Sequence, residues 1–242
     1  MAKNEFLVSP LPIEPAAAEP YGNPATFGRL ICEEIRRRNA RTVLDIGAGR
    51  ELIDWLRPIR REAATLVGID PDEAVVANPH LDLALLGRVE DVDAGALKAD
   101  IAYSFNVVEH IERPRPFLQR VNGFLKPGGS FWFFSTNEWH PFCLIGHVIR
   151  LGRVKGYYRF GMSIAGHTGI NEYPSYYRLN RVGRIARLAR SSGFSQLHYA
   201  LLPSSWEAYV PSALRFAPRM YDALVQRWIP AGRLILMCRL VK

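Results

Sequence analysis

Short apolar runs alternate with segments of helical periodicity along the first 136 residues of the chain. The apolar runs are continuous, which is typical of strands buried on both faces of a parallel sheet. They lie at 42–46, 65–69, 82–86, 101–105 and 130–135. Helical spacing between them predicts helices at 26–38, 51–61, 72–77 and 116–125. This alternation predicts an α/β fold with a parallel sheet covered on both faces.

The periodicity is lost after residue 136 and returns near residue 181. Such a long irregular stretch within a compact domain is typical of a lid or binding insertion, which we expect at about 137–178. Beyond it the pattern predicts, in order, a helix, a strand, a helix and a strand at 181–192, 194–202, 221–228 and 233–241. The proline-rich residues 1–23 are expected to form an N-terminal arm before a domain at 24–242.

Composition places the chain among ordinary globular proteins. With 242 residues, 48% hydrophobic and 22% charged, it is neither disordered, collagen-like nor a coiled coil. Its three cysteines are far apart and odd in number, so no disulfide framework is expected. There is no run of eighteen apolar residues and no signal-peptide pattern, and we expect a cytoplasmic protein.

The net charge of +8 is concentrated in the last part of the chain. Residues 150–242 hold 15 Lys and Arg against 3 Asp and Glu, which favours anionic partners such as phosphorylated metabolites, acidic lipids or nucleic acid. A general preference for arginine over lysine gives the same composition. Arginines stand at every third position through the basic helix predicted near residue 181, at 178, 181, 184, 187 and 190. It is either a solvated face or a site of peripheral contact with an anionic inner-membrane surface.

A glycine turn follows the first predicted strand and indicates a ligand site. Gly47 and Gly49 allow close approach of the backbone, but the dinucleotide pattern G-x-G-x-x-G fails because Leu52 stands at its third glycine. Asp45 precedes the turn, and Asp70 ends the second predicted strand. A carboxylate at that strand end can accept both hydroxyls of a ribose. The combination favours a nucleoside-type ligand with a cationic or hydroxyl-rich part.

Five motifs in order carry a resemblance to a known family. They are VLDIGAG at 43–49, VGID at 67–70, GRVEDV at 87–92, ADIAYSFNVVEHI at 99–111 and FLKPGGSFWFFSTN at 124–137. Over about residues 25–202, with 233–241 as a closing antiparallel strand, the chain resembles class I S-adenosylmethionine-dependent methyltransferases. The resemblance implies a doubly wound, seven-stranded Rossmann-like sheet, S-adenosylmethionine as cofactor and S-adenosylhomocysteine as product.

The resemblance also assigns cofactor contacts to matching positions. The methionine part and the ribose would meet residues of the first two motifs, namely Asp45, Gly47, Ala48, Gly49, Asp70 and Pro71. Among these, Asp45 would meet the amino group, directly or through water, and Asp70 would bind the ribose. The family often has a third glycine where Glu51 stands in this chain, and that departure would narrow the loop.

The remaining cofactor contacts fall after the third and fourth strands. Arg88 and Val89 would flank the adenine, although the family usually has an acid at the Arg88 position, and Glu90 or Asp91 could take over that contact. Phe105 and Asn106 would lie beside the sulfonium and its methyl group.

Methyl transfer is an in-line displacement in which the cofactor carries the reactive group and the protein supplies position. A base is needed only when the acceptor must lose a proton, as a hydroxyl does. His110 is the candidate base, with a backbone-bonded histidine at a helix start as the alternative. Glu109 is expected to support the loop, and Tyr176 and Tyr177 to contact substrate, with packing of the lid as their alternative role.

His140 is a further candidate for contact with the substrate. With Cys143 and His147 it also forms the spacing H-x-x-C-x-x-x-H, which could hold zinc. Since no fourth ligand is evident and the chemistry needs no metal, we expect no metal site.

The function predicted is O-methylation of a small molecule, a glycan or a lipid-linked acceptor. Within the family, the pair Glu109-His110 and the KPGG turn most resemble small-molecule methyltransferases, including quinone-pathway O-methyltransferases. The stretch PSYYRLN at 174–180 resembles bacterial methyltransferases thought to act on glycans or lipids. One alternative is a nucleic-acid (RNA) methyltransferase, although the fourth strand ends in Phe105-Asn-Val-Val and not in N/D-P-P-Y/F. Another is a non-catalytic, cofactor-binding partner subunit.

Overall fold

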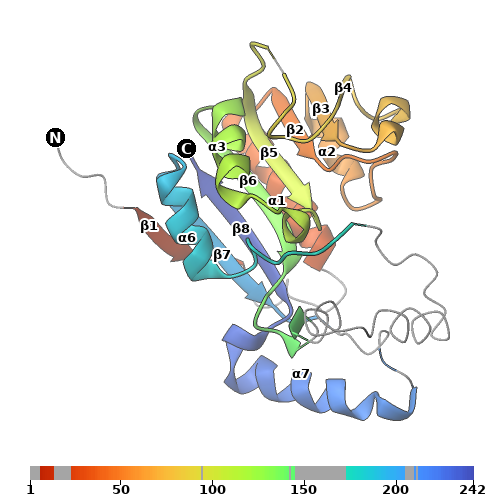
Figure 1. Ribbon diagram of the computed structural model, residues 1–242, viewed down its shortest axis with the longest axis vertical. Helices are drawn as coiled ribbons and strands as arrows, with labels where there is room; N and C mark the ends of the chain where they lie inside the picture. Colours follow the sequence, from red (N-terminus) through yellow and green to blue (C-terminus); the bar gives the residue numbers. More distant parts are fainter. Residues whose placement is uncertain are drawn as a thin grey trace.

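The computed structural model describes residues 6–13, 23–93, 95–141, 143–144, 173–204, 210 and 212–242. Within these ranges the chain forms one mixed sheet with helices on both faces (Figure 1). The strands lie in the order β1-β7-β8-β6-β5-β2-β3-β4. Their bounds are β1 Leu7–Pro10, β2 Thr42–Ile46, β3 Thr65–Asp70, β4 Leu83–Leu86, β5 Ala99–Phe105, β6 Leu125–Thr136, β7 Gln196–Leu202 and β8 Ile235–Val241.

All neighbouring strands run parallel except where β8 pairs with β6 and β7, so the predicted closing antiparallel strand is confirmed. The prediction of seven strands was wrong by one. The eighth is β1, which pairs with the edge of the sheet at Leu7↔Gln196 through Pro10↔Tyr199. Leu7 and Val8 are exposed, and such a short edge strand has no buried face that a hydrophobic pattern could reveal. The rest of the predicted arm, at 1–5 and 14–22, lies outside the described residues.

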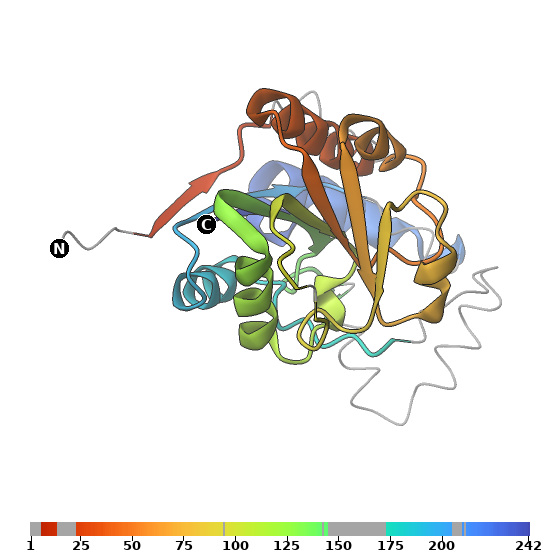
Figure 2. The same cartoon turned by 90° about the horizontal axis from the view of Figure 1, so that it is seen from above.

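Two pairs of helices cover the sheet from opposite sides, as Figure 2 shows from above. Helices α1 (Asn23–Arg38) and α2 (Arg57–Glu62) pack together on one face, and α3 (Pro114–Phe124) and α6 (Val182–Ser191) on the other. Successive strand residues alternate between the two resulting cores, since Val43 joins the α1 side and Leu44 the α3 side. Helix α7 (Phe216–Trp228) lies between β7 and β8 in the chain.

The helices differ most from the sequence predictions at three places, one of which is α7, since it begins at Phe216 and not at residue 221. The helix expected at 51–61 begins only at Arg57, because Pro58 stands in the first turn of α2, where its missing N–H leaves no hydrogen bond unmade. The helix expected at 72–77 is a 3₁₀ segment, η2 (Glu73–Ala77), and further 3₁₀ turns are η3 (Val108–His110), η5 (Ser212–Leu214) and η6 (Pro230–Gly232). No helix in the described ranges has the length and apolar character needed to cross a bilayer. Of the insertion expected at about 137–178, residues 145–172 lie outside the described part.

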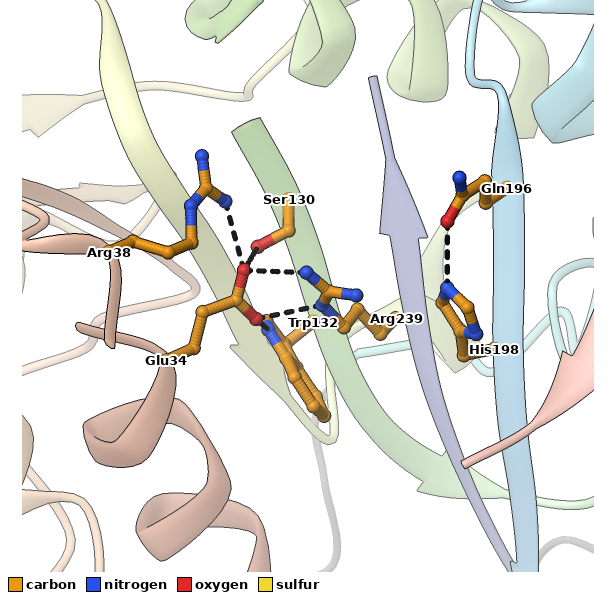
Figure 3. Close-up of polar contacts among 7 residues, drawn as sticks. All are labelled: Glu34, Arg38, Ser130, Trp132, Gln196, His198 and Arg239. Carbon is orange, nitrogen blue, oxygen red and sulfur yellow. Dashed lines mark hydrogen bonds and ion pairs between the residues drawn. The ribbon is translucent and has the colours of Figure 1, made fainter. Parts of the chain in front are cut away.

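A buried carboxylate joins α1 to the centre of the sheet (Figure 3). Glu34 accepts two hydrogen bonds from Arg239 at 2.7 and 2.8 Å, and further ones from Arg38, Ser130 and Trp132 at 2.9, 2.9 and 2.7 Å. Burial alone would raise the pKa of Glu34. The hydrogen bonds and charge of Arg239, helped by those of Arg38 and Ser130, outweigh burial and lower that pKa to about 2. The acid is therefore ionised and fully bonded.

All three cysteines are buried, free thiols. Burial raises the pKa of Cys32 to about 11 and that of Cys143 to about 12, and it raises the pKa of Cys238 well above its ordinary value. Each thiol is therefore protonated in the folded protein at neutral pH.

Candidate active site

A cavity of about 350 Å³ opens at the carboxyl ends of β2, β3, β4 and β5. Because β2 has β3 on one side and β5 on the other, this is the point where the strand order reverses, and such points hold ligands in α/β sheets. The cavity is lined by Ile46, Gly47, Ile69, Asp70, Pro71, Gly87, Arg88, Val89, Glu90, Phe105, Asn106, Val107, His110, Ile111, Glu112, Arg113, Phe117, Tyr173, Pro174 and Tyr176.

The glycine turn after β2 forms one wall of the cavity. Gly47 has φ +83°, and a Cβ there would lie 2.3 Å from Val107 Cγ2. No residue with a side chain fits that position without displacing Val107. The Gly47 amide donates to the Ile69 carbonyl at 2.8 Å, and the Gly49 amide donates to Asp70 Oδ2 at 3.0 Å. The turn is thus fastened to the end of β3.

Asp70 is held in a fixed orientation on the cavity wall. One carboxylate oxygen accepts from Gly49, and the other accepts from the Asp72 amide at 2.8 Å. Each carboxylate oxygen has a second lone pair, so both can accept a further hydrogen bond from a ligand hydroxyl. This geometry suits the two hydroxyls of a ribose.

Asp45 lies behind the cavity wall and is not part of the lining. It is 4% exposed, and it accepts a hydrogen bond from the Tyr103 hydroxyl at 2.6 Å. Burial raises the pKa of Asp45 to about 7, against the hydrogen bond of Tyr103 and with help from the charge of Asp70. Ala48 and Gly49 also lie outside the lining, so the turn presents Gly47 to the cavity and Asp45 lies behind it.

The end of β5 contributes an aromatic ring and a strained backbone. The Phe105 ring stacks on Phe134 with 4.7 Å between centroids. Asn106 has φ +53°, a left-handed conformation uncommon outside glycine, and its amide donates to the Phe134 carbonyl at 2.9 Å. Such residues gather at functional sites, where the surrounding structure holds them in place.

The turn after β4 and Pro71, which follows β3, form a further part of the cavity lining. Pro71, Arg88, Val89 and Glu90 all line the cavity, and the Arg88 carbonyl accepts two backbone hydrogen bonds at 2.9 Å from the residues that close this turn. Glu51, where the family often has a glycine, is exposed and does not line the cavity.

His110 lines the cavity beside the last residues of the expected insertion. Its Nδ1 is 3.2 Å from the Pro174 carbonyl oxygen, and the Tyr173 ring is 6.2 Å away between centroids. A carbonyl only accepts hydrogen bonds, so Nδ1 is the donor in this contact, and in the neutral form of the ring the lone pair is then on Nε2.

A buried polar network holds the chain from residue 173 to 180 against the cavity. The Glu109 carbonyl accepts from the amides of Tyr176 and Tyr177 at 2.6 and 3.0 Å. The buried Glu109 side chain accepts from Ser135 Oγ at 2.7 Å, and Asn180 in turn donates to Ser135 Oγ at 2.7 Å. Burial raises the pKa of Glu109. Ser135 and Asn180 lie in two of the quoted motifs but were not predicted as site residues, because their partners are 26 and 45 residues away.

Two of the predicted substrate residues do not reach the cavity lining. Tyr177 adopts φ +52° and turns the chain beside it, whereas Tyr176 does line the cavity. His140 is buried beneath α7, with Nε2 3.8 Å from Asp222 Oδ1 and its ring 5.1 Å from that of Tyr221.

No group of three or more His, Cys, Asp or Glu side chains in the described part of the chain could hold a metal ion. His147, the third residue of the spacing that could hold zinc, lies outside that part.

Comparisons with known proteins agree with the expected family. Residues 25–167 match the family described as "Methyltransferase domain". The ubiquinone biosynthesis O-methyltransferase of Bradyrhizobium diazoefficiens is 33% identical over 111 residues, which cover 42% of this chain and 43% of that protein. The match thus covers less than half the length of this relative.

Solved structures share the fold at low sequence identity. A SAM-dependent methyltransferase from Archaeoglobus fulgidus superposes with a TM-score of 0.53 at 16% identity, covering 89% of this chain and 94% of that one. The plantazolicin methyltransferase BpumL, in complex with SAH and a substrate analogue, gives a TM-score of 0.54 at 16% identity, covering 92% and 84%. These likenesses confirm the Rossmann-like fold.

Proposed function

The chain belongs to the methyltransferase domain family, and from that premise we propose that it uses S-adenosylmethionine to methylate a hydroxyl group on a small acceptor. One observation carries the proposal: most residues predicted from the motifs to touch the cofactor line a single cavity at the switch point of the sheet. They come from four different strands. A sequence resemblance alone does not require these residues to lie around one cavity, so their arrangement supports a cofactor site.

The chain's own residues divide the work of binding. Asp70 accepts the ribose hydroxyls, Gly47 lets the methionine part approach the backbone, and Phe105 and Asn106 border the reacting end. The bound cofactor supplies an activated methyl group. Positioning the acceptor in line with that group is the main contribution that the protein makes to such a reaction.

His110 is the proposed general base. The lone pair on its Nε2 can take the proton of an acceptor hydroxyl while Nδ1 stays bonded to Pro174. Tyr173 and Tyr176 then form the aromatic wall on the acceptor side. The relatives' name, ubiquinone biosynthesis O-methyltransferase, supports a hydroxyl on a small apolar molecule. It favours this reading over a nucleic-acid substrate or a non-catalytic role.

The proposed acceptor class includes hydroxyls on lipid-linked molecules and glycans, and peripheral contact with an anionic membrane belongs to the same proposal. Its support is the positive charge of residues 150–242, with 15 basic against 3 acidic side chains.

Calorimetric titration with S-adenosylmethionine and S-adenosylhomocysteine tests the cofactor site. The wild type should bind both at micromolar concentration. Asp70→Asn and Asp70→Ala should weaken binding by about tenfold or more, because a charged acceptor for the ribose is lost. Glu51→Ala, an exposed change beside the same turn, is the matched control and should bind as the wild type does. A wild type that binds neither ligand, or an Asp70→Ala variant with unchanged affinity, contradicts the proposal.

A further inference from the structure

Helix α7 carries a row of large apolar side chains along its outer side. Phe216, Met220, Leu224 and Trp228 are 65%, 68%, 51% and 70% exposed. Residues four apart lie on one side of a helix, so these four form a continuous row, here called the α7 stripe. Val225, on the opposite side, is buried. A contiguous exposed apolar surface of this kind marks a site of contact with another protein or with a membrane.

The basic side chains of α7 flank the stripe, whereas its acidic side chain faces the interior. Arg215 and Arg219 are exposed and each precedes a stripe residue, which puts both along one flank. Asp222 is the one acidic residue in the sequence of α7, and it faces the interior, where it approaches His140 at 3.8 Å. The outer side of the helix therefore combines apolar residues with arginines and turns its carboxylate away.

The arginine helix that the sequence singled out is largely committed to contacts within the chain. Arg184 forms an ion pair with Glu138 at 2.9 Å. Arg181 lies over the Trp139 ring at 4.6 Å, and Arg178 donates to a backbone carbonyl. These contacts fasten α6 and the residues before it to the loop after β6 and to the cavity mouth.

Helix α7 lies at the edge of the sheet where the cavity opens. It belongs to the segment that connects the end of β7, at Leu202, to the start of β8, at Ile235. These two residues pair with each other in the sheet. Ile235 also pairs with Thr136, the last residue of β6, and β6 runs parallel to β5, which ends at Phe105. In Figure 1 the helix accordingly lies beyond the tips of the central arrows.

We propose that α7 docks the protein on the surface of an anionic lipid bilayer. The α7 stripe enters the boundary between headgroups and acyl chains, and Arg215 and Arg219 meet the lipid phosphates. The docking stands on the exposure and charge of α7. That a docked molecule takes its acceptor from the bilayer rests on the proposed function.

Self-association through α7 is the competing explanation for an apolar stripe. Pairing two copies of the helix would bring Arg215 and Arg219 of both copies to one interface, and α7 offers no outward carboxylate to balance them. Like charges at an interface are unfavourable, so charge complementarity favours an anionic surface over a second copy.

Flotation with vesicles tests the docking. Vesicles of 70% phosphatidylcholine and 30% phosphatidylglycerol should bind the wild type at least about tenfold more tightly than pure phosphatidylcholine. Met220→Glu/Leu224→Glu should reduce that binding by about 100-fold, because two apolar insertions become charged. Arg215→Glu/Arg219→Glu should reduce it by about tenfold or more. The fluorescence of the wild type should shift to the blue on binding, and Trp228→Phe should remove most of the shift.

Two matched variants place the effect on α7. Val76→Glu/Leu83→Glu makes the same change at exposed apolar positions far along the sheet, and Arg187→Glu/Arg190→Glu reverses charge on α6. Both should bind vesicles as the wild type does. S-adenosylmethionine affinity and thermal melting, measured without lipid on every variant, separate loss of docking from loss of fold or of the cofactor site.

The docking is wrong if the wild type fails to bind the anionic vesicles or binds neutral ones equally well. It is also wrong if the α6 pair abolishes binding while the α7 variants retain it. A wild-type dimer that Met220→Glu/Leu224→Glu converts to a monomer, without vesicle binding, assigns the stripe to a second copy. In each of these outcomes cofactor binding in solution still decides the proposed function separately.

Discussion

Asp45 shows how burial changes the role of a single side chain. The sequence placed it against the amino group of the cofactor, and the structure buries it beneath the glycine turn, bonded to Tyr103. With its pKa raised to about 7, its charge depends on pH in the neutral range. A cation bound in the adjacent cavity favours the ionised form.

We therefore expect the affinity for S-adenosylmethionine to rise by about threefold to tenfold between pH 6 and pH 8, as Asp45 ionises. S-adenosylhomocysteine lacks the sulfonium charge and should show a weaker dependence. Calorimetric titrations at several pH values measure both. Asp45→Asn should flatten the profile, and a variant that keeps the wild-type pH dependence would assign it to another group.

Gly47 is the second residue whose role is set by its immediate surroundings. Gly47→Ala forces a Cβ to 2.3 Å from Val107 Cγ2 at a φ of +83°. We expect a loss of about 1–3 kcal/mol in the free energy of unfolding and weaker cofactor binding. Urea denaturation measures the first effect. Gly183→Ala on α6 is the control and should be neutral or slightly stabilising, because the added Cβ has no atom within 4 Å besides its chain neighbours and the nearby backbone of its own helix.

Residue types at strand ends were predictable from sequence, whereas packing of the insertion was not. Asp70 and Asn106 follow apolar runs, and parallel strands bring such positions to one edge. His140 has no periodic context, and its place under α7 depends on a helix more than 70 residues later. The network of Ser135 and Asn180 is invisible for the same reason, since it forms only after the chain has folded back.

At the scale of elements, the Glu34 network joins α1 to β6 and β8. The folded-state pKa of Glu34, about 2, lies below its ordinary value of 4.5. This difference stabilises the fold by roughly 3 kcal/mol above the ordinary pKa, and the contribution is lost as pH falls through the folded-state value. The network thus links the attachment of one helix to acidity.

Urea denaturation between pH 7 and pH 2.5 should reveal that link. The wild type should lose stability below about pH 4.5, and Glu34→Gln should be less stable at pH 7 and lose less on acidification. Glu33→Gln is the neighbouring control, because its exposed pair with Arg29 contributes little. If Glu34→Gln follows the wild-type acid profile, other carboxylates account for it.

The predicted bounds of an element were wrong where one residue can stand at either end of a helix. Pro58 ends a helix or begins one, and apolar periodicity alone cannot choose. The edge strand β1 was missed because it is short and exposed. The central strands were found because burial on both faces leaves short, continuous apolar runs.

On the scale of the whole molecule, the topology brings unrelated tasks to one edge. The cavity, the network around Glu109 and the loop that holds His140 all lie beyond the carboxyl ends of the parallel strands, and α7 starts and ends there too. The family match explains the sheet order and the motifs. It does not explain the exposed stripe, which belongs to a part of the chain beyond the matched residues.

The reactivity of the three buried cysteines reports how often the folded protein opens locally. Alkylating and disulfide reagents attack thiolates, and these thiols are both shielded and protonated while the fold is closed. Modification then proceeds only through open states. Cys32 lies in α1 and Cys238 in β8. The modification rate of Cys32 therefore measures local opening at α1, and that of Cys238 measures opening of the sheet at β8.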